Sequence, residues 1–197
     1  TNDYSGGTII SNGMIRLGNN YALGSGIVTF RDGGLASDGN TSRTLTNALY
    51  IPTNAQLGDR TNWGPLIFSG TVDCNNGTRT LTIQSDVTFS GTITNGRFTK
   101  AGTNSTLKIT GICDWGSGTP EVQNGTLLFT DGASVTNNGD IRPNGIGQLR
   151  EARLVITNGA IVELSGNNNW RVGNSGNPSA TNIIDAAGIM RISGFTS

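Results

Sequence analysis

The sequence predicts an all-β chain wound as a parallel β-solenoid, forming a single domain over residues 1–197. The first reason is composition: 30 of the 197 residues are Gly and only 13% are charged. The second is that the apolar residues are mostly β-branched or long aliphatic side chains in short alternating clusters, which a disordered chain has no reason to carry. The third is that these clusters recur behind turn residues without an intervening helical pattern.

The recurring unit is an Asn-Gly pair followed by a short apolar alternation. Asn and Gly readily adopt positive φ, so the pair suits a turn that leads into a strand. Such pairs precede predicted strands at Asn12-Gly13, Asn76-Gly77, Asn95-Gly96, Asn124-Gly125 and Asn158-Gly159. Further short strands are predicted at residues 26–30, 66–68, 86–89, 106–109, 154–156 and 189–192.

This periodicity favours a solenoid over a sandwich or a barrel. Stacked coils require repeated turn–strand–turn units, each of which buries its inward residues against its neighbours. Coils of about 20–25 residues are expected for such repeats. Like residues would then lie in ladders about 4.8 Å apart, where Thr methyl groups pack and Asn amides can hydrogen-bond along the stack.

The charge pattern argues against two classes of partner. Thirteen basic residues balance 13 acidic residues. The basic side chains are scattered singly along the chain, so we expect no nucleic acid partner. No apolar run has membrane-spanning length, so we also expect no membrane insertion of this segment.

The absence of His removes most familiar catalytic and metal sites. Without it there is no Ser-His or Cys-His nucleophile and no zinc motif, and the sequence has neither a P-loop nor a GxGxxG motif. We therefore expect no catalytic residue, no metal and no cofactor. The remaining enzyme alternative is a polysaccharide lyase or glycosidase on a β-helix, which would pair carboxylates across a groove.

Seven Asp residues are candidates for that alternative. In such a chain an Asp is more often a turn residue whose side chain caps the turn, and the Asp-Gly pairs at 32, 38 and 131 fit this interpretation. Calcium binding across residues 32–40 is another alternative, although the spacing matches neither the EF-hand loop nor the calcium-binding nonapeptide. The candidates are Asp32, Asp38, Asp59, Asp73, Asp114, Asp131 and Asp140.

The three tryptophans, Trp63, Trp115 and Trp170, have two interpretations. An exposed indole could stack on a sugar ring, whereas an indole that packs a loop or fills a corner would be structural. The structural use is the more common one.

Cys74 and Cys113 are the two cysteines of the chain. In an oxidising compartment they could form one disulfide, and otherwise they would be two buried thiols. Their separation along the sequence is close to two ordinary coils. Positions two coils apart lie about 9.6 Å from each other, whereas a disulfide needs Cα atoms within about 7 Å. A bridge would therefore require a long intervening coil or a turn that brings them closer.

Two stretches resemble the autotransporter-associated β-strand repeat. Residues 4–18 carry an aromatic residue, Gly-Gly-Thr, a turn Gly and alternating apolar residues, and residues 98–129 follow the pattern from its Lys-x-Gly half onward, with one extra residue around Pro120. Trp115 matches the aromatic position, which implies a structural role. The resemblance implies a right-handed parallel β-helix in an extracellular passenger region with a structural or adhesive role, and it supplies no catalytic residues.

From these observations we expect a non-enzymatic module, located extracellularly or on a bacterial cell surface, with glycan or cell-surface contacts as further partners. Residues 188–194 resemble the first half of the repeat and residues 4–18 the second half. We therefore expect head-to-tail stacking, either as tandem copies in one chain or as subunits of a fibre. The alternative is a sequence that simply begins and ends within a repeat. The alternative function is a carbohydrate-binding or polysaccharide-cleaving β-helix.

Overall fold

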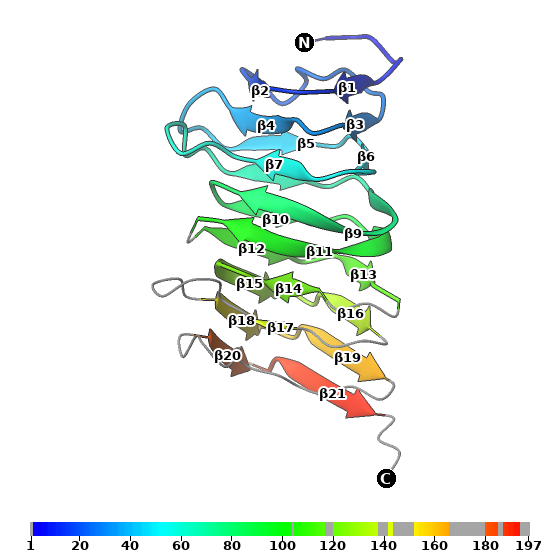
Figure 1. Cartoon of the computed structure of the whole chain (residues 1–197), viewed down its shortest axis with the longest axis vertical. Coiled ribbons are helices and arrows are strands. Elements are labelled where there is room, and N and C mark those ends of the chain that lie inside the picture. Colours follow the sequence, from blue (N-terminus) through cyan, green and yellow to red (C-terminus); the bar gives the residue numbers. More distant parts are fainter. Residues whose placement is uncertain are drawn as a thin grey trace.

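The structure is a computed structural model that describes residues 2–103, 105–116, 120–137, 142–143, 152–165, 180–184 and 187–193. Every strand pairing in these ranges is parallel. The strands stack along one axis, with the N-terminal coil at one end of the rod and the C-terminal coil at the other (Figure 1). The predicted all-β parallel solenoid is confirmed, and its right-handed winding stays a prediction.

The described strands form three ladders. The first contains β1 (Thr8–Ile10), β3 (Val28–Phe30), β6 (Leu49–Tyr50), β9 (Val72–Ile83), β11 (Ile93–Gly102), β13 (Ile112–Asp114), β16 (Ser134–Asn137), β19 (Ile161–Ser165) and β21 (Ile189–Ser193). The second contains β5 (Arg43–Leu45), β8 (Leu66–Phe68), β10 (Val87–Phe89), β12 (Thr106–Ile109), β15 (Gly125–Phe129), β18 (Ala152–Ile156) and β20 (Ala180–Ile184). The third runs through β2 (Met14–Leu17), β4 (Gly34–Ser37), β7 (Ala55–Leu57), the distal halves of β9 and β11, β14 (Glu121–Val122) and β17 (Arg142–Pro143). None of the described residues belongs to a helix that could cross a membrane.

The register of the first ladder gives the length of each coil. Its first step pairs Ile10 with Phe30. Every step from β1 down to β16 agrees with the expected coil of about 20–25 residues. The last two steps pair Val135 with Val162 and Val162 with Met190, so the coils at the C-terminal end are longer than expected.

The core is a set of inward-facing columns. In β3, Val28 and Phe30 are buried while Thr29 between them is partly exposed, as strand alternation requires. In the second ladder Phe68 and Phe89 share one inward position in adjacent coils, and their ring centroids lie 5.6 Å apart. Burying each such side chain contributes about 1.5–3 kcal/mol. Stability is thus distributed along the rod, coil by coil.

Each predicted Asn-Gly corner has positive φ at one residue at least, and two corners have it at both. Asn95 and Gly96 have φ of 54° and 126°, and Asn158 and Gly159 have 49° and 76°. One detail of the prediction was wrong, because Asn76-Gly77 and Asn95-Gly96 lie within β9 and β11 and not before a new strand. The two strands keep pairing around the corner, with a register shift between Thr94 and Gly96.

Asn side chains connect successive coils. The amide of Asn47 donates to the carbonyl oxygens of Gly24 and Gly26, at 3.1 and 2.8 Å. The amide of Asn124 donates to the carbonyl oxygen of Gly102 at 2.6 Å. Each bond reaches a preceding coil, so the expected hydrogen bonding of Asn amides along the stack is confirmed.

Candidate functional site

Three of the candidate acids cap their own turns. A carboxylate oxygen of Asp73 accepts the backbone N–H of Asn75 at 2.8 Å, and one of Asp114 accepts that of Gly116 at 3.1 Å. Asp59 accepts both the N–H and the hydroxyl of Thr61 at 2.9 Å. These are the short Asx turns that Asp forms with the backbone two residues further on.

Asp73 and Asp114 also lie in one outward column of the first ladder. Asp73 pairs with Thr94, and the register of the next coil places Asp114 beside Thr94. Two such steps span about 9.6 Å, close to the separation of about 6.5–9.5 Å between the carboxyl groups of inverting glycosidases. However, each carboxylate is already bonded to a turn N–H. This favours the turn interpretation of both residues.

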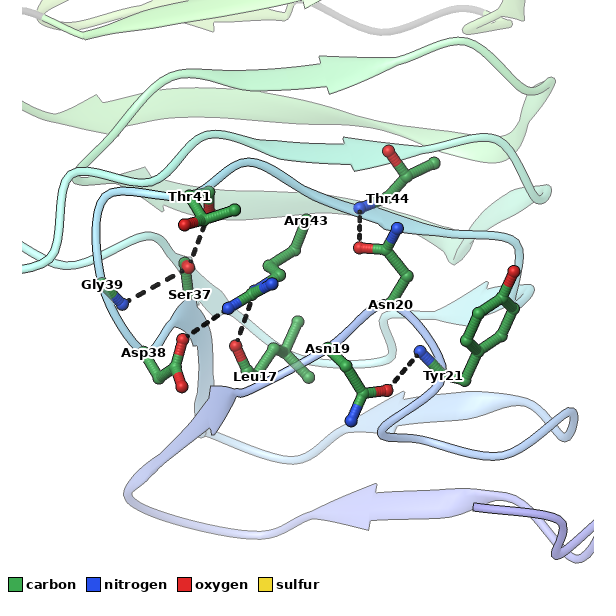
Figure 2. A network of polar contacts seen from close by, with 10 residues as sticks. All are labelled: Leu17, Asn19, Asn20, Tyr21, Ser37, Asp38, Gly39, Thr41, Arg43 and Thr44. Atoms are coloured by element: carbon green, nitrogen blue, oxygen red, sulfur yellow. Dashed lines mark hydrogen bonds and ion pairs between the residues drawn. The ribbon is translucent and has the colours of Figure 1, made fainter. Parts of the chain in front are cut away.

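Asp38 belongs to a network that holds the turn between β4 and β5 (Figure 2). Its carboxylate pairs with the Arg43 guanidinium at 2.7 Å, and Nε of Arg43 donates to the carbonyl oxygen of Leu17 at 2.9 Å. Within the same turn, the Ser37 hydroxyl donates to the carbonyl oxygen of Thr41 at 2.8 Å. Asp38 therefore orients Arg43, whose guanidinium bonds this turn to the preceding coil.

Asp32 is fixed through its backbone, and Asp131 through its carboxylate. Asp32 adopts a left-handed φ of 63° and its N–H donates to the Thr53 hydroxyl at 3.2 Å. Asp131 pairs with Lys108 at 2.6 Å and accepts the Asn158 amide at 2.6 Å, and these bonds lower its pKa. Asp140 lies outside the described residues. Within the described ranges, no three His, Cys, Asp or Glu side chains gather to hold a metal, so the calcium alternative gains no support there.

Two of the three tryptophans differ in their burial. Trp115 is 1% exposed and packs edge-on against Phe98, with ring centroids 5.3 Å apart, and against Phe129 at 5.7 Å. Its structural role is confirmed. Trp63 is 55% exposed, so the more common packing interpretation does not describe it. Trp170 lies outside the described residues.

A hollow of about 590 Å³ opens beside Trp63 and is lined by Trp63, Ser85, Asp86, Thr103 and Ser105. Three successive coils contribute to it, because Leu66, Val87 and Leu107 share one register position of the second ladder. The lining residues lie in the corners that precede these three strands. Its size falls within the range of about 300–1,000 Å³ that is usual for ligand pockets.

The polar groups of the Trp63 hollow are fixed in orientation. One oxygen of the exposed Asp86 carboxylate accepts the N–H of Thr106 at 2.7 Å. The Ser105 hydroxyl donates to the carbonyl oxygen of Ile83 at 2.9 Å, and the Thr103 hydroxyl lies 3.1 Å from that of Ser105. Such second contacts hold a site in one geometry before a ligand arrives.

A buried cation lies beneath this corner. Lys100 is fully buried, and its ammonium donates to the carbonyl oxygens of Asn124 at 2.6 Å and Thr103 at 3.4 Å. Burial lowers the pKa of Lys100 to about 8, and the negative charge of Asp86 opposes that shift. Asp86 is thus the exposed charge of the hollow, with a compensating positive charge inside the coil.

A second groove, of about 580 Å³, lies over the first ladder near the N-terminal end. Ile9 and Ile27 expose more than half of their side chains there, and Tyr50 contributes an aromatic edge. Asp73 is the charged lining residue, but its two oxygens are occupied by the Asn75 N–H and the Asn95 amide. This groove offers apolar surface without an available charge.

The two cysteines are free, buried thiols. Cys113 pairs with Ile93, which pairs with Val72 in the coil that contains Cys74. The thiols therefore lie two coils apart, as the spacing indicated. Burial raises the pKa of Cys74 to about 12 and also raises that of Cys113.

The sequence analysis did not identify Asp86, Ser85, Thr103 or Ser105 as site residues. Part of the signal was available, because Asp86 is the first residue of a predicted strand and Ser105 immediately precedes the next one. The pairing of those strands with residues 66–68, which brings all four residues beside Trp63, comes from the register in the structure. No protein-family model, curated protein or solved structure matches this chain.

Proposed function

We propose that this chain is an extracellular structural or adhesive rod that lengthens by adding coils at its ends, in the manner of autotransporter-type surface proteins. The observation that carries the proposal is the outer edge of the first described coil, which can pair with a further coil of the same chain or of another chain. In the described chain β1 pairs only with β3, and β2 only with β4. Unpaired strand edges are templates for further strands.

The backbone of β1 identifies which groups are available at that edge. The N–H of Thr8 donates to the carbonyl oxygen of Ile27 at 2.9 Å, and the carbonyl oxygen of Ile10 accepts the N–H of Arg31 at 2.7 Å. In a parallel ladder alternate residues bond to the same neighbour. The N–H and C=O of Ile9 therefore point away from β3, toward the position that a preceding coil would occupy.

Two further observations support a structural or adhesive role. The carboxylates of five of the six candidate acids within the described ranges are bonded in a turn or an ion pair, and Asp32 sits at a left-handed turn position, which supports a rod without a reacting pair of carboxylates. The resemblance of residues 4–18 and 98–129 to the autotransporter-associated repeat supports an extracellular location. The free thiols do not oppose it, because two positions two coils apart cannot bridge.

The test uses Ile9→Pro, which removes the outward N–H, with Ile9→Thr as the matched control that retains it. Sedimentation and electron microscopy of the native chain should show axial oligomers that grow with concentration. Ile9→Pro should lower this association while Ile9→Thr preserves it. A native chain that is monomeric at every concentration would overturn assembly from separate subunits, and so would an Ile9→Pro variant that assembles normally.

A further inference from the structure

We infer that the Trp63 hollow binds a neutral saccharide, with the indole as the stacking surface and Asp86 as the hydrogen-bond acceptor. The inference rests on the adhesive role in the proposed function and gives that role a ligand class. It is independent of the open strand edge, because Trp63 lies in the corner before β8 and not in the first coil.

The indole is exposed but its backbone is fixed. The N–H of Trp63 donates to the side-chain oxygen of Asn40 at 3.3 Å, and the N–H of Gly64 donates to the carbonyl oxygen of Gly39 at 3.0 Å. Gly64 also lies so close to the preceding coil that an added Cβ would be 2.4 Å from the carbonyl oxygen of Thr41. The backbone that carries the indole is therefore fixed, and a flat apolar ring with a polar edge suits the face of a pyranose.

The Asp86 carboxylate can orient a ligand in the hollow. Because the Thr106 N–H holds one oxygen of Asp86, the carboxylate cannot rotate freely. Its other oxygen has no hydrogen-bond partner among the described residues, so it can accept hydroxyl protons from a ligand. Convergence of an apolar platform with a few fixed polar groups is the usual composition of a small-ligand site.

The charges disfavour an anionic ligand. Asp86 is the ionisable residue of the lining, so an anionic polysaccharide would meet a like charge. The positive charge of Lys100 is fully buried and is bonded to carbonyl oxygens, so it is not available to an acidic sugar. Arg60 is close in sequence, but its Nε donates to Gln84 at 2.8 Å and its side chain does not line the hollow.

The chain itself provides a conservative replacement for Asp86. In other corners, the side-chain oxygens of Asn20 and Asn54 accept the N–H groups of Thr44 and Thr80 at 3.0 and 2.9 Å, in the same way that Asp86 accepts that of Thr106. Figure 2 shows the Asn20 example. Asp86→Asn should therefore keep the corner while removing the charge, and Asp86→Ala should remove the acceptor as well.

Calorimetric titration with cellohexaose, mannohexaose and chitohexaose, and with oligogalacturonate as the anionic comparison, tests the inference. At least one neutral probe should bind, and Trp63→Ala should weaken that binding by about tenfold or more. Trp63→Phe should restore part of it. Asp86→Ala should bind more weakly than Asp86→Asn. Tyr21→Ala is the control, because Tyr21 is 63% exposed and does not line the hollow.

Three results would overturn the inference: no binding of any neutral probe, equal binding by Trp63→Ala, or a preference for oligogalacturonate. Far-UV circular dichroism of each variant separates loss of the site from loss of the fold. Sedimentation keeps the two proposals apart. Trp63→Ala should still assemble as the native chain does, and Ile9→Pro should still bind the saccharide.

Discussion

The ammonium group of Lys100 donates a 2.6 Å hydrogen bond to the backbone carbonyl oxygen of Asn124 in the next coil, and both residues are buried. The side chain of Asn124 in turn donates to the carbonyl oxygen of Gly102 in the coil of Lys100. The two residues thus link adjacent coils in both directions at one corner. Buried backbone carbonyl oxygens require hydrogen-bond donors. The ammonium group at the end of the long Lys100 side chain provides them at this corner.

Lys100 should make stability increase with pH in one window. Burial lowers its pKa from 10.5 to about 8 in the folded chain. Between these values the unfolded chain retains a proton that the folded chain has released, so the free energy of unfolding rises with pH, by at most about 1.4 kcal/mol per pH unit. Below pH 8 both states are protonated and the contribution is constant.

Urea unfolding of the native chain and of Lys100→Met, from pH 7 to pH 10.5, measures this contribution. The difference in unfolding free energy between the two chains should grow in favour of the native chain from pH 8 upward. At pH 7 the variant also loses donors for two carbonyl oxygens, at a cost of about 1–3 kcal/mol for each buried acceptor left unsatisfied. A difference that stays constant with pH would show that Lys100 does not titrate in this window.

The buried thiols should make stability decrease as pH rises, which is opposite to the effect of Lys100. Burial raises the pKa of Cys74 from 9.0 to about 12, so above pH 9 the unfolded chain loses thiol protons that the folded chain keeps. The stability associated with the folded thiol is complete below pH 9 and is lost as pH rises from there. Cys74→Ala should therefore lose less stability than the native chain between pH 9 and pH 11, measured by urea unfolding.

The same burial predicts thiol reactivity. A disulfide-exchange reagent should react slowly with the folded chain, because the thiolate is the reactive form and both thiols are buried and protonated. After denaturation without reductant, two thiols per chain should react. Finding none would show that Cys74 and Cys113 are bridged, which contradicts their placement two coils apart.

The strands that the sequence predicts best are those with one buried and one exposed face. Leu66–Phe68 and Thr106–Ile109 alternate in burial and match the predicted bounds. Gly34–Ser37 was missed because all four residues are buried, so the strand carries no alternation. The two-residue strand β6 is too short for a periodic signal.

The candidate site could not be predicted from any single segment of the sequence, because it combines residues of three coils. Trp63 and Trp115 both lie in corners between predicted strands. They differ in the residues of the adjacent coils that surround them. Trp115 meets Phe98 and Phe129, whereas Trp63 overhangs a hollow lined by hydroxyls and Asp86. That difference follows from the register between coils, which short and variable corners leave undetermined in the sequence.

Asp59 should make the first coils sensitive to acid. Its hydrogen bonds to Thr61 and its ion pair with Arg16 lower its pKa from 3.8 to about 2. Its contribution to stability is therefore complete above pH 4 and is lost as pH falls toward 2. Asp59→Asn should be less stable than the native chain at pH 7, and thermal unfolding should show this gap closing between pH 4 and pH 2. A gap that is independent of pH would contradict the assignment.

Gly91 should tolerate no side chain, because it lies against the preceding coil. An added Cβ would be 2.0 Å from the carbonyl oxygen of Gly70, and real Cβ atoms do not approach backbone oxygen so closely. Since that oxygen belongs to the backbone of a stacked coil, the coils must separate locally, and we expect Gly91→Ala to lower the free energy of unfolding by about 1–3 kcal/mol. Gly39→Ala is the matched control, because nothing lies within 4 Å of its Cβ position. Urea unfolding should place Gly39→Ala close to the native chain, and equal stability of the two variants would show that the coils are not stacked this closely at Gly91.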